Sequence, residues 1–191
     1  LLALLKDSKM KYDRIDNSLY IHTRKQFVKH LKPKSLAVFN SNDIYPISAD
    51  STMPFQQQRD ILYLSGVDQE ESILLIFPDA ADENQREILF LKETSPTIAV
   101  WEGAKLDKND AFEVSGIKTV YWLDQFEMIF NQLMSQAENV YININEHLRA
   151  NTETQTREDR FIIWLKDKYP GHSYDRSAPI MHQIRAIKHP L

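Results

Sequence analysis

The sequence predicts an α/β domain with three layers, in which a mixed β-sheet of about five strands carries helices on both faces. The first observation is that short apolar and aromatic runs alternate along the 191 residues with longer segments whose apolar residues recur at helical spacing. The second is that 42% hydrophobic and 26% charged residues are ordinary proportions for one globular domain of this length. Strands that alternate with helices favour a sheet covered on both sides.

We expect the domain to open with a helix over residues 17–31 and a buried strand over 35–39. Asn17 or Ser18 suits the N-cap of the helix, and Pro33 ends it because the residue before a proline avoids helical geometry. The apolar residues near one face of this helix are Tyr20, Phe27, Val28 and Leu31. The strand is a continuous run of mostly apolar residues, which is typical of a sheet interior.

A short helix is predicted over residues 59–65, directly after the three successive glutamines at 56–58. Gly66 follows it and can take a positive φ without a Cβ penalty, so we expect Gly66 to end the helix. Asp60 lies in the first turn, where we expect its carboxylate to meet backbone N–H donors. The glutamines then form the entry loop, and the side chains that face the core are Ile61, Leu62 and Leu64.

Four further elements are expected in the middle of the chain. Residues 71–77 and 86–91 read as strands, and the turn-rich connection between them predicts a hairpin. Residues 107–116 begin with an aspartate and end with a glycine, which suits a short helix. Residues 117–122 follow as another strand.

The clearest helix spans residues 126–137. Its apolar residues fall on one stripe at helical period, namely Phe126, Ile129, Phe130, Leu133, Met134 and Ala137. Asp124 and Glu127 form a capping-box-like pair at its start. A strand over 139–144 and a last long helix over 158–171 complete the predicted layers.

The sequence divides into three parts. Residues 1–16 are expected to be an N-terminal extension, and residues 17–176 one domain. Residues 177–191 fit none of the layers and are expected to be a connector. No internal repeat and no low-complexity block suggests a further boundary within the chain.

Several classes of function are disfavoured by composition and motifs. A net charge of −4 argues against a basic surface that would bind nucleic acid, and no segment predicts contact with a membrane. The chain has no cysteine, which fits a reducing cytoplasm, and none of its six histidines has metal-ligand spacing. The predicted strands lack the acidic residues of a magnesium-dependent nuclease. We therefore predict no metal ligand and no catalytic residue in this chain.

The sequence pattern alone does not assign a role to two residues, Trp101 and Asp50. Trp101 lies beside Glu102 and Gly103 just after a turn, where a tryptophan that plugs the core is the plainer interpretation. Asp50 lies in a polar loop, where a turn-forming acid is the plainer interpretation.

A longer motif surrounds Asp50. The segment SADSTMPFQQQRDILYLSGVDQEESILLIF, residues 48–77, resembles the N-terminal domain of Xaa-Pro aminopeptidases, also called aminopeptidase P. The matching positions are Asp50, Pro54, Phe55, Gln57, Asp60, Tyr63, Leu64, Ser65 and Gly66. Three more segments match in order, at 88–90, 101–106 and 179–190. The resemblance covers nearly the whole chain from about residue 17.

The resemblance implies a creatinase/aminopeptidase P N-terminal domain with ribonuclease H-like layering. In this family a C-terminal pita-bread domain binds two divalent metal ions, usually manganese, and removes the N-terminal residue that precedes a penultimate proline. Those ligands are not in this chain. We therefore expect a non-catalytic, cytoplasmic domain that mediates homo-oligomer contacts and restricts access of peptides to the active site.

The resemblance also implies that Trp101 and Asp50 bind substrate in trans, at the active site of a neighbouring subunit. One departure is that the family usually has arginine at the position of Gln56 and a small polar residue at that of Arg59. An N-terminal domain of a prolidase or creatinase-like enzyme is one alternative. A stand-alone binding or structural module is another.

Overall fold

The computed structural model describes residues 15–147 and 154–190, and its centre is a mixed sheet of six strands. The predicted extension, residues 1–16, lies almost entirely outside the described residues. The strands run across the sheet in the order β6, β5, β4, β1, β7 and β8. Their bounds are β6 Thr119–Trp122, β5 Glu87–Leu91, β4 Ile73–Ile76, β1 Ser35–Asn40, β7 Asn139–Ile142 and β8 Ser173–Arg176.

The pairing of the strands confirms the predicted mixed sheet and its hairpin. β4 is antiparallel to β5 and to β1, while β6 is parallel to β5, and β7 is parallel to both β1 and β8. One strand more than the expected five is present, the edge strand β8. Its sequence, Ser-Tyr-Asp-Arg, is polar and only partly buried, so no apolar run marked it as a strand.

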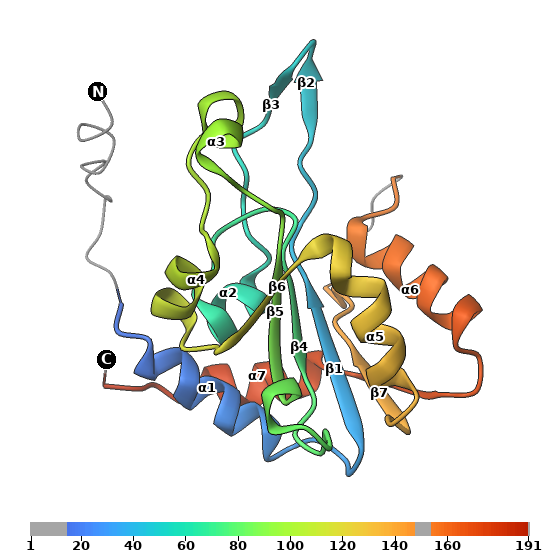
Figure 1. Ribbon diagram of the computed structural model, residues 1–191. Coiled ribbons are helices and arrows are strands. Elements are labelled where there is room, and N and C mark those ends of the chain that lie inside the picture. The colour runs from blue at the N-terminus through green and yellow to red at the C-terminus, as the bar shows by residue number, and fades with distance from the viewer. Residues whose placement is uncertain (1–14, 148–153, 191) are drawn as a thin grey trace.

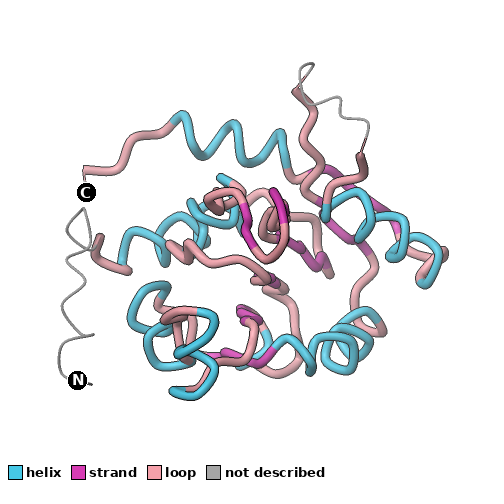
Figure 2. Tube along the Cα trace, turned by 90° about the horizontal axis from the view of Figure 1, so that it is seen from above, coloured by secondary structure: helices cyan, strands magenta, loops and turns pink. Residues whose placement is uncertain are grey.

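Helices cover both faces of the sheet, as expected for three layers (Figures 1 and 2). One face carries α5 and α6, and the other carries α1, α2, α4 and α7. Along β1, Leu36 and Val38 face the α5 side, while Ala37 and Phe39 face the other, so the sheet has a core on each face. The helix bounds are α1 Ser18–Val28, α2 Arg59–Ser65, α4 Lys108–Ser115, α5 Phe126–Met134, α6 Arg157–Lys168 and α7 Ala178–Ala186.

The apolar stripe predicted for α5 is confirmed, but its predicted cap is not. All six stripe residues are buried against the sheet. A 3₁₀ turn, η3 (Leu123–Gln125), precedes the helix, and there the side-chain Oε1 of Gln125 accepts a hydrogen bond from the backbone N–H of Trp122 at 3.3 Å. The expected pairing of Asp124 with Glu127 is therefore wrong, because the turn begins earlier in the chain than the apolar stripe.

The expectation that residues 177–191 stand outside the layers is wrong. They include α7, which packs beside α1 and buries Ala178, Ile180, Met181 and Ile184 in the core. Ser177 attaches its start, since the Ser177 hydroxyl donates to the Ile142 carbonyl at 3.0 Å and to Asn143 Oδ1 at 2.7 Å. Whether the chain continues from α7 into a catalytic domain stays a prediction.

The three glutamines before α2 have mainly structural contacts. Gln57 is buried, and its Nε2 donates to the carbonyls of Val67 and Gln69 at 3.1 and 2.9 Å. Gln58 is the N-cap of α2, because its Oε1 accepts from the N–H groups of residues 60 and 61. The expected role of Asp60 is corrected: its carboxylate accepts hydrogen bonds from Arg185 and from the side chain of Gln58 instead.

A fully buried arginine joins three elements on the α1 side. Arg24 of α1 donates to the carbonyls of Leu64 and Ser115 at 2.8 and 3.0 Å, at the ends of α2 and α4. Its Nε also forms an ion pair with Glu87 of β5 at 2.9 Å. The C-terminal end of a helix attracts a cation, so one guanidinium stabilises both helix ends.

The two helix ends that Arg24 contacts are built alike. Each ends in a serine whose hydroxyl donates to the carbonyl four residues earlier, and each serine is followed by a left-handed glycine. Gly66 has φ of 71° and Gly116 has φ of 70°, which confirms both predicted glycine caps.

At the upper end of the sheet, Glu158 fixes the first turn of α6. Its carboxylate accepts from Asn40 Nδ2 at 2.9 Å and from the backbone N–H of Asn143 at 3.4 Å, at the ends of β1 and β7. Removal of this carboxylate from water raises the pKa of Glu158 to about 7, although the two hydrogen bonds act in the opposite direction.

Gly66→Ala is expected to lower the free energy of unfolding by about 2–4 kcal/mol, through left-handed strain and overpacking. A Cβ at this position would lie 2.3 Å from Cε2 of Tyr20. Gly171→Ala is the matched control, since its Cβ would meet nothing within 4 Å. Urea denaturation of both variants measures the difference, and equal effects at the two sites would contradict this account of the cap.

At pH values between the ordinary pKa of a glutamate and about 7, Glu158 is protonated in the folded chain but ionised in the unfolded chain. We therefore expect stability to fall as pH rises from about 5 to 8, by up to about 3 kcal/mol from this group. Glu158→Gln should remove most of that slope in urea titrations at several pH values. The control Glu113→Gln, at an exposed position, should keep the slope, and an unchanged slope in Glu158→Gln would refute the assignment.

Candidate functional site

The candidate site lies at the upper end of the sheet, where two small elements project beyond the strands (Figure 1). One is a hairpin of β2 (Pro46–Ser48) and β3 (Ser51–Thr52), and the other is the helix α3 (Pro96–Glu102). Sequence analysis predicted neither element. Both are short: the two strands are exposed along their length, and the apolar run at 98–101 is too short to show a helical period.

Trp101 lies on α3 with 86% of its surface exposed, and its neighbour Val100 is 76% exposed. The interpretation that Trp101 plugs the core is therefore wrong, and the exposure needed for a role in binding is present. The helix begins where Ser95 caps it by accepting from the N–H of Ile98 at 3.2 Å, with Pro96 in the first turn.

A cluster of four ion pairs holds the end of α3 that carries Trp101. Glu102 contacts Lys92 and Lys105 at 2.9 Å each, Lys105 contacts Glu70 at 2.9 Å, and Lys92 contacts Glu71 at 3.3 Å. The hydrogen bonds from Lys105 and Lys92 lower the pKa of Glu102, and the bond to Glu102 is the main reason that the pKa of Lys92 is raised. The Lys105 side chain is only 9% exposed, so this network is partly shielded from water.

The chain then turns back toward the sheet through Gly103, whose φ is 82°. The backbone N–H of Leu106 donates to Oε1 of Gln69 at 2.8 Å. Within the motif at 101–106, the residues after Trp101 therefore hold the loop in place through ion pairs and a backbone hydrogen bond. Trp101 itself is exposed to solvent.

Asp50 lies in the turn between β2 and β3, next to Ala49, which has a φ of 50°. Its side chain is exposed and makes no hydrogen bond or ion pair with the described residues. The structure thus brings Asp50 and Trp101 to the same end of the molecule, on separate elements, with no hydrogen bond between them. The exposed apolar side chains of these elements and of the adjoining residues 45 and 53, here called the apolar tip, are Tyr45, Ile47, Met53, Val100 and Trp101.

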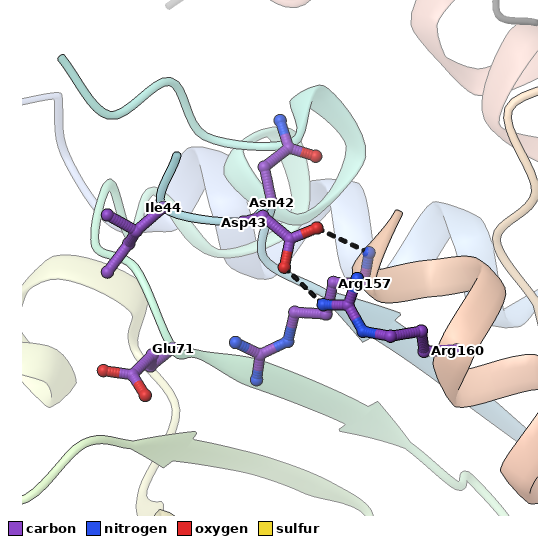
Figure 3. A pocket seen from close by; sticks show the side chains of 6 residues that line it. All are labelled: Asn42, Asp43, Ile44, Glu71, Arg157 and Arg160. Carbon is purple, nitrogen blue, oxygen red and sulfur yellow. Dashed lines mark hydrogen bonds and ion pairs between the residues drawn. The ribbon is translucent and has the colours of Figure 1, made fainter. Parts of the chain in front are cut away.

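Below the apolar tip, a polar pocket of about 350 Å³ lies between the end of β1 and the start of α6 (Figure 3). Asp43 accepts from the backbone N–H of Arg157 at 2.7 Å and from the guanidinium of Arg160 at 2.5 Å. Sequence analysis missed this pocket, because its residues come from segments more than a hundred positions apart. The lining residues are Asn42, Asp43, Ile44, Glu71, Arg157 and Arg160.

Residues 15–147 and 154–190 contain no group of three or more histidines and acidic residues that could hold a metal ion. The described residues therefore do not fit the metal centre that the resemblance implies, and we assign no catalytic step to them. None of the described helices is long and apolar enough to cross a bilayer.

Comparison with known proteins agrees with this geometry. Among curated relatives, the Xaa-Pro aminopeptidase of Escherichia coli is 23% identical over 87% of this chain and 38% of its own length. Rat Xaa-Pro aminopeptidase 3 is 24% identical over 96% of this chain and 36% of its own length. Among solved structures, one of a putative aminopeptidase P from Bacillus anthracis has a TM-score of 0.80, with 22% identity over 92% of this chain and 41% of that one.

This chain spans well under half the length of these relatives. The match to the family described as "Aminopeptidase P, N-terminal domain" covers residues 20–141, which is more than half of the chain and includes the hairpin, α2 and α3. The chain therefore belongs to the aminopeptidase P N-terminal domain family.

Proposed function

We propose that this chain is the non-catalytic N-terminal domain of a metal-dependent Xaa-Pro aminopeptidase, and that its apolar tip borders the active site of a neighbouring subunit. The observation that carries the proposal is Trp101, a large apolar side chain held almost fully in solvent by a network of ion pairs. An exposed apolar patch on a well-anchored element typically marks an interaction surface.

The chemistry of the apolar tip suits a peptide that contains proline. An indole ring is rigid and can stack on a pyrrolidine ring at little entropic cost. Asp50 offers two carboxylate oxygens with no partner among the described residues, so it can accept hydrogen bonds from a substrate or from groups that position it. We assign both residues to substrate binding in trans.

The named relatives support the aminopeptidase over a prolidase, a creatinase-like enzyme or a stand-alone module. Several are Xaa-Pro aminopeptidases, and structures of the Escherichia coli enzyme include one with the inhibitor Pro-Leu and one, zinc-substituted, with product. By this proposal the substrates are peptides with proline at the second position. Two divalent metal ions, manganese in our proposal, would then bind in a catalytic domain beyond these residues.

We further propose that the full protein is a homo-oligomer located in the cytoplasm. Oligomers are required because a tip that acts in trans needs a second subunit. An Arabidopsis relative is named a mitochondrial peptidase.

In the full-length protein, Trp101→Ala is expected to reduce kcat/KM for Xaa-Pro peptides by about tenfold or more, because a stacking contact is lost. The melting temperature should stay within about 2 °C, because an exposed side chain contributes little to the core. Ile163→Ala, an exposed apolar position on α6, is the control for surface truncation. Unfolding without a kinetic defect would count against the assignment.

The purified 191-residue chain is expected to hydrolyse no Xaa-Pro peptide, with or without added manganese, because its described residues offer no metal-ligand cluster. Release of the N-terminal residue can be followed by chromatography of a proline-containing tripeptide. Metal-dependent release that survives a second, orthogonal purification would show that the chain carries its own active site.

A further inference from the structure

We propose that the polar pocket and the aromatic cavity beside it form one binding site for a small amphipathic carboxylate, with the carboxylate at Arg157 and an apolar group among aromatic rings. This inference does not depend on the proposed aminopeptidase function. It follows from an unpaired guanidinium, an adjoining cavity and the charges around them.

The guanidinium of Arg157 has no hydrogen bond or ion pair with any residue that the structure describes. It is partly buried, and this burial lowers the pKa of Arg157, while the charges of Glu71 and Asp43 act on it across the pocket. Both carboxylates have partners already: Asp43 binds Arg160 and the backbone N–H of Arg157, and Glu71 binds Lys92. Figure 3 shows the Arg157 guanidinium in the pocket, pointing away from the Asp43–Arg160 pair. A partly buried cation without a direct partner favours an anionic ligand.

A second cavity of about 300 Å³ adjoins the first and shares Arg157 and Arg160 with it. Its other walls are mostly apolar, and its polar lining residues are already bonded, Asn40 to Glu158 and Glu127 to Lys168. Its apolar lining residues are Ile73, Phe126, Phe161 and Trp164. An arginine next to aromatic and aliphatic walls provides one charged and one apolar contact for the same ligand.

The surrounding charges select a monoanion rather than a phosphate. Asp43, Glu71 and Glu127 line the two cavities, so a dianion would meet more repulsion than a single carboxylate. A carboxylate also matches the fork of a guanidinium with two parallel hydrogen bonds. An N-acylated amino acid, or the C-terminal residue of a peptide, has the required carboxylate and apolar group.

The test titrates this chain with N-acetyl-phenylalanine and, separately, with its amide, while amide NMR shifts are recorded. We expect the carboxylate to shift residues around Arg157 and Trp164 and to bind roughly tenfold to a hundredfold more tightly than the amide. Arg157→Gln should abolish that difference, with an unchanged circular dichroism spectrum. Arg86→Gln, far from the site, and Ile163→Ala, on the same helix, should keep it.

Three results would overturn the proposal. They are equal binding of the acid and the amide, unchanged affinity in Arg157→Gln, or shifts that map elsewhere on the chain. Two further probes test the carboxylate contact and the apolar contact separately. Acetate should bind more weakly than N-acetyl-phenylalanine, because it leaves the aromatic cavity empty, and inorganic phosphate should not displace N-acetyl-phenylalanine. Preference for either probe would contradict an amphipathic monoanion site.

Discussion

The buried guanidinium of Arg24 is the interaction on which the arrangement of this domain depends. It binds the last carbonyls of α2 and α4 and the carboxylate of Glu87, and burial lowers its pKa because the charged form loses hydration. A buried charge is tolerated only when its hydrogen bonds are largely satisfied. The requirement to surround Arg24 therefore fixes α1, α2 and α4 relative to β5, and with them the position at which the loop after Gly66 begins.

That loop, residues 67–71, connects the part of the fold that Arg24 holds in place to the candidate site at the upper end of the sheet. Its first residues accept hydrogen bonds from Gln57, and Gln69 and Glu70 bind Leu106 and Lys105 of the loop after α3. Glu71 forms an ion pair with Lys92 and also lines the polar pocket. One short loop thus positions the end of α3 that carries Trp101 and contributes one wall of the polar pocket. Because the strands themselves are apolar and buried, the polar side chains of the site lie in the segments that follow the ends of β1, β5 and β7, as is usual for sheets of this class.

The sequence by itself determined the elements whose signals are local. Apolar runs marked five strands, the six-residue stripe marked α5, and the Asp107 and Gly116 caps marked α4. Gly66 was predictable because only a glycine takes a left-handed conformation without a Cβ penalty. Arg24 was not singled out by the sequence, because a charged side chain argues against burial even where it shares a helical face with Tyr20 and Phe27. The match of ordered motifs also indicated the family before any contact was known.

Only the tertiary structure decided the elements and residues whose state depends on distant partners. The strand β8 is polar and forms because β7 offers an open edge, and α7 is a helix of the core because α1 and the sheet leave an apolar surface for Met181 and Ile184. The same tryptophan would be buried or exposed according to whether its short helix is held away from the core, and ion pairs from Lys92 and Lys105 hold it away. The polar pocket brings residues 42–44 next to residues 157 and 160, a proximity that no local pattern encodes. Propensity and periodicity act over a few residues, whereas burial, charge pairing and exposure are set by whatever the completed fold places alongside.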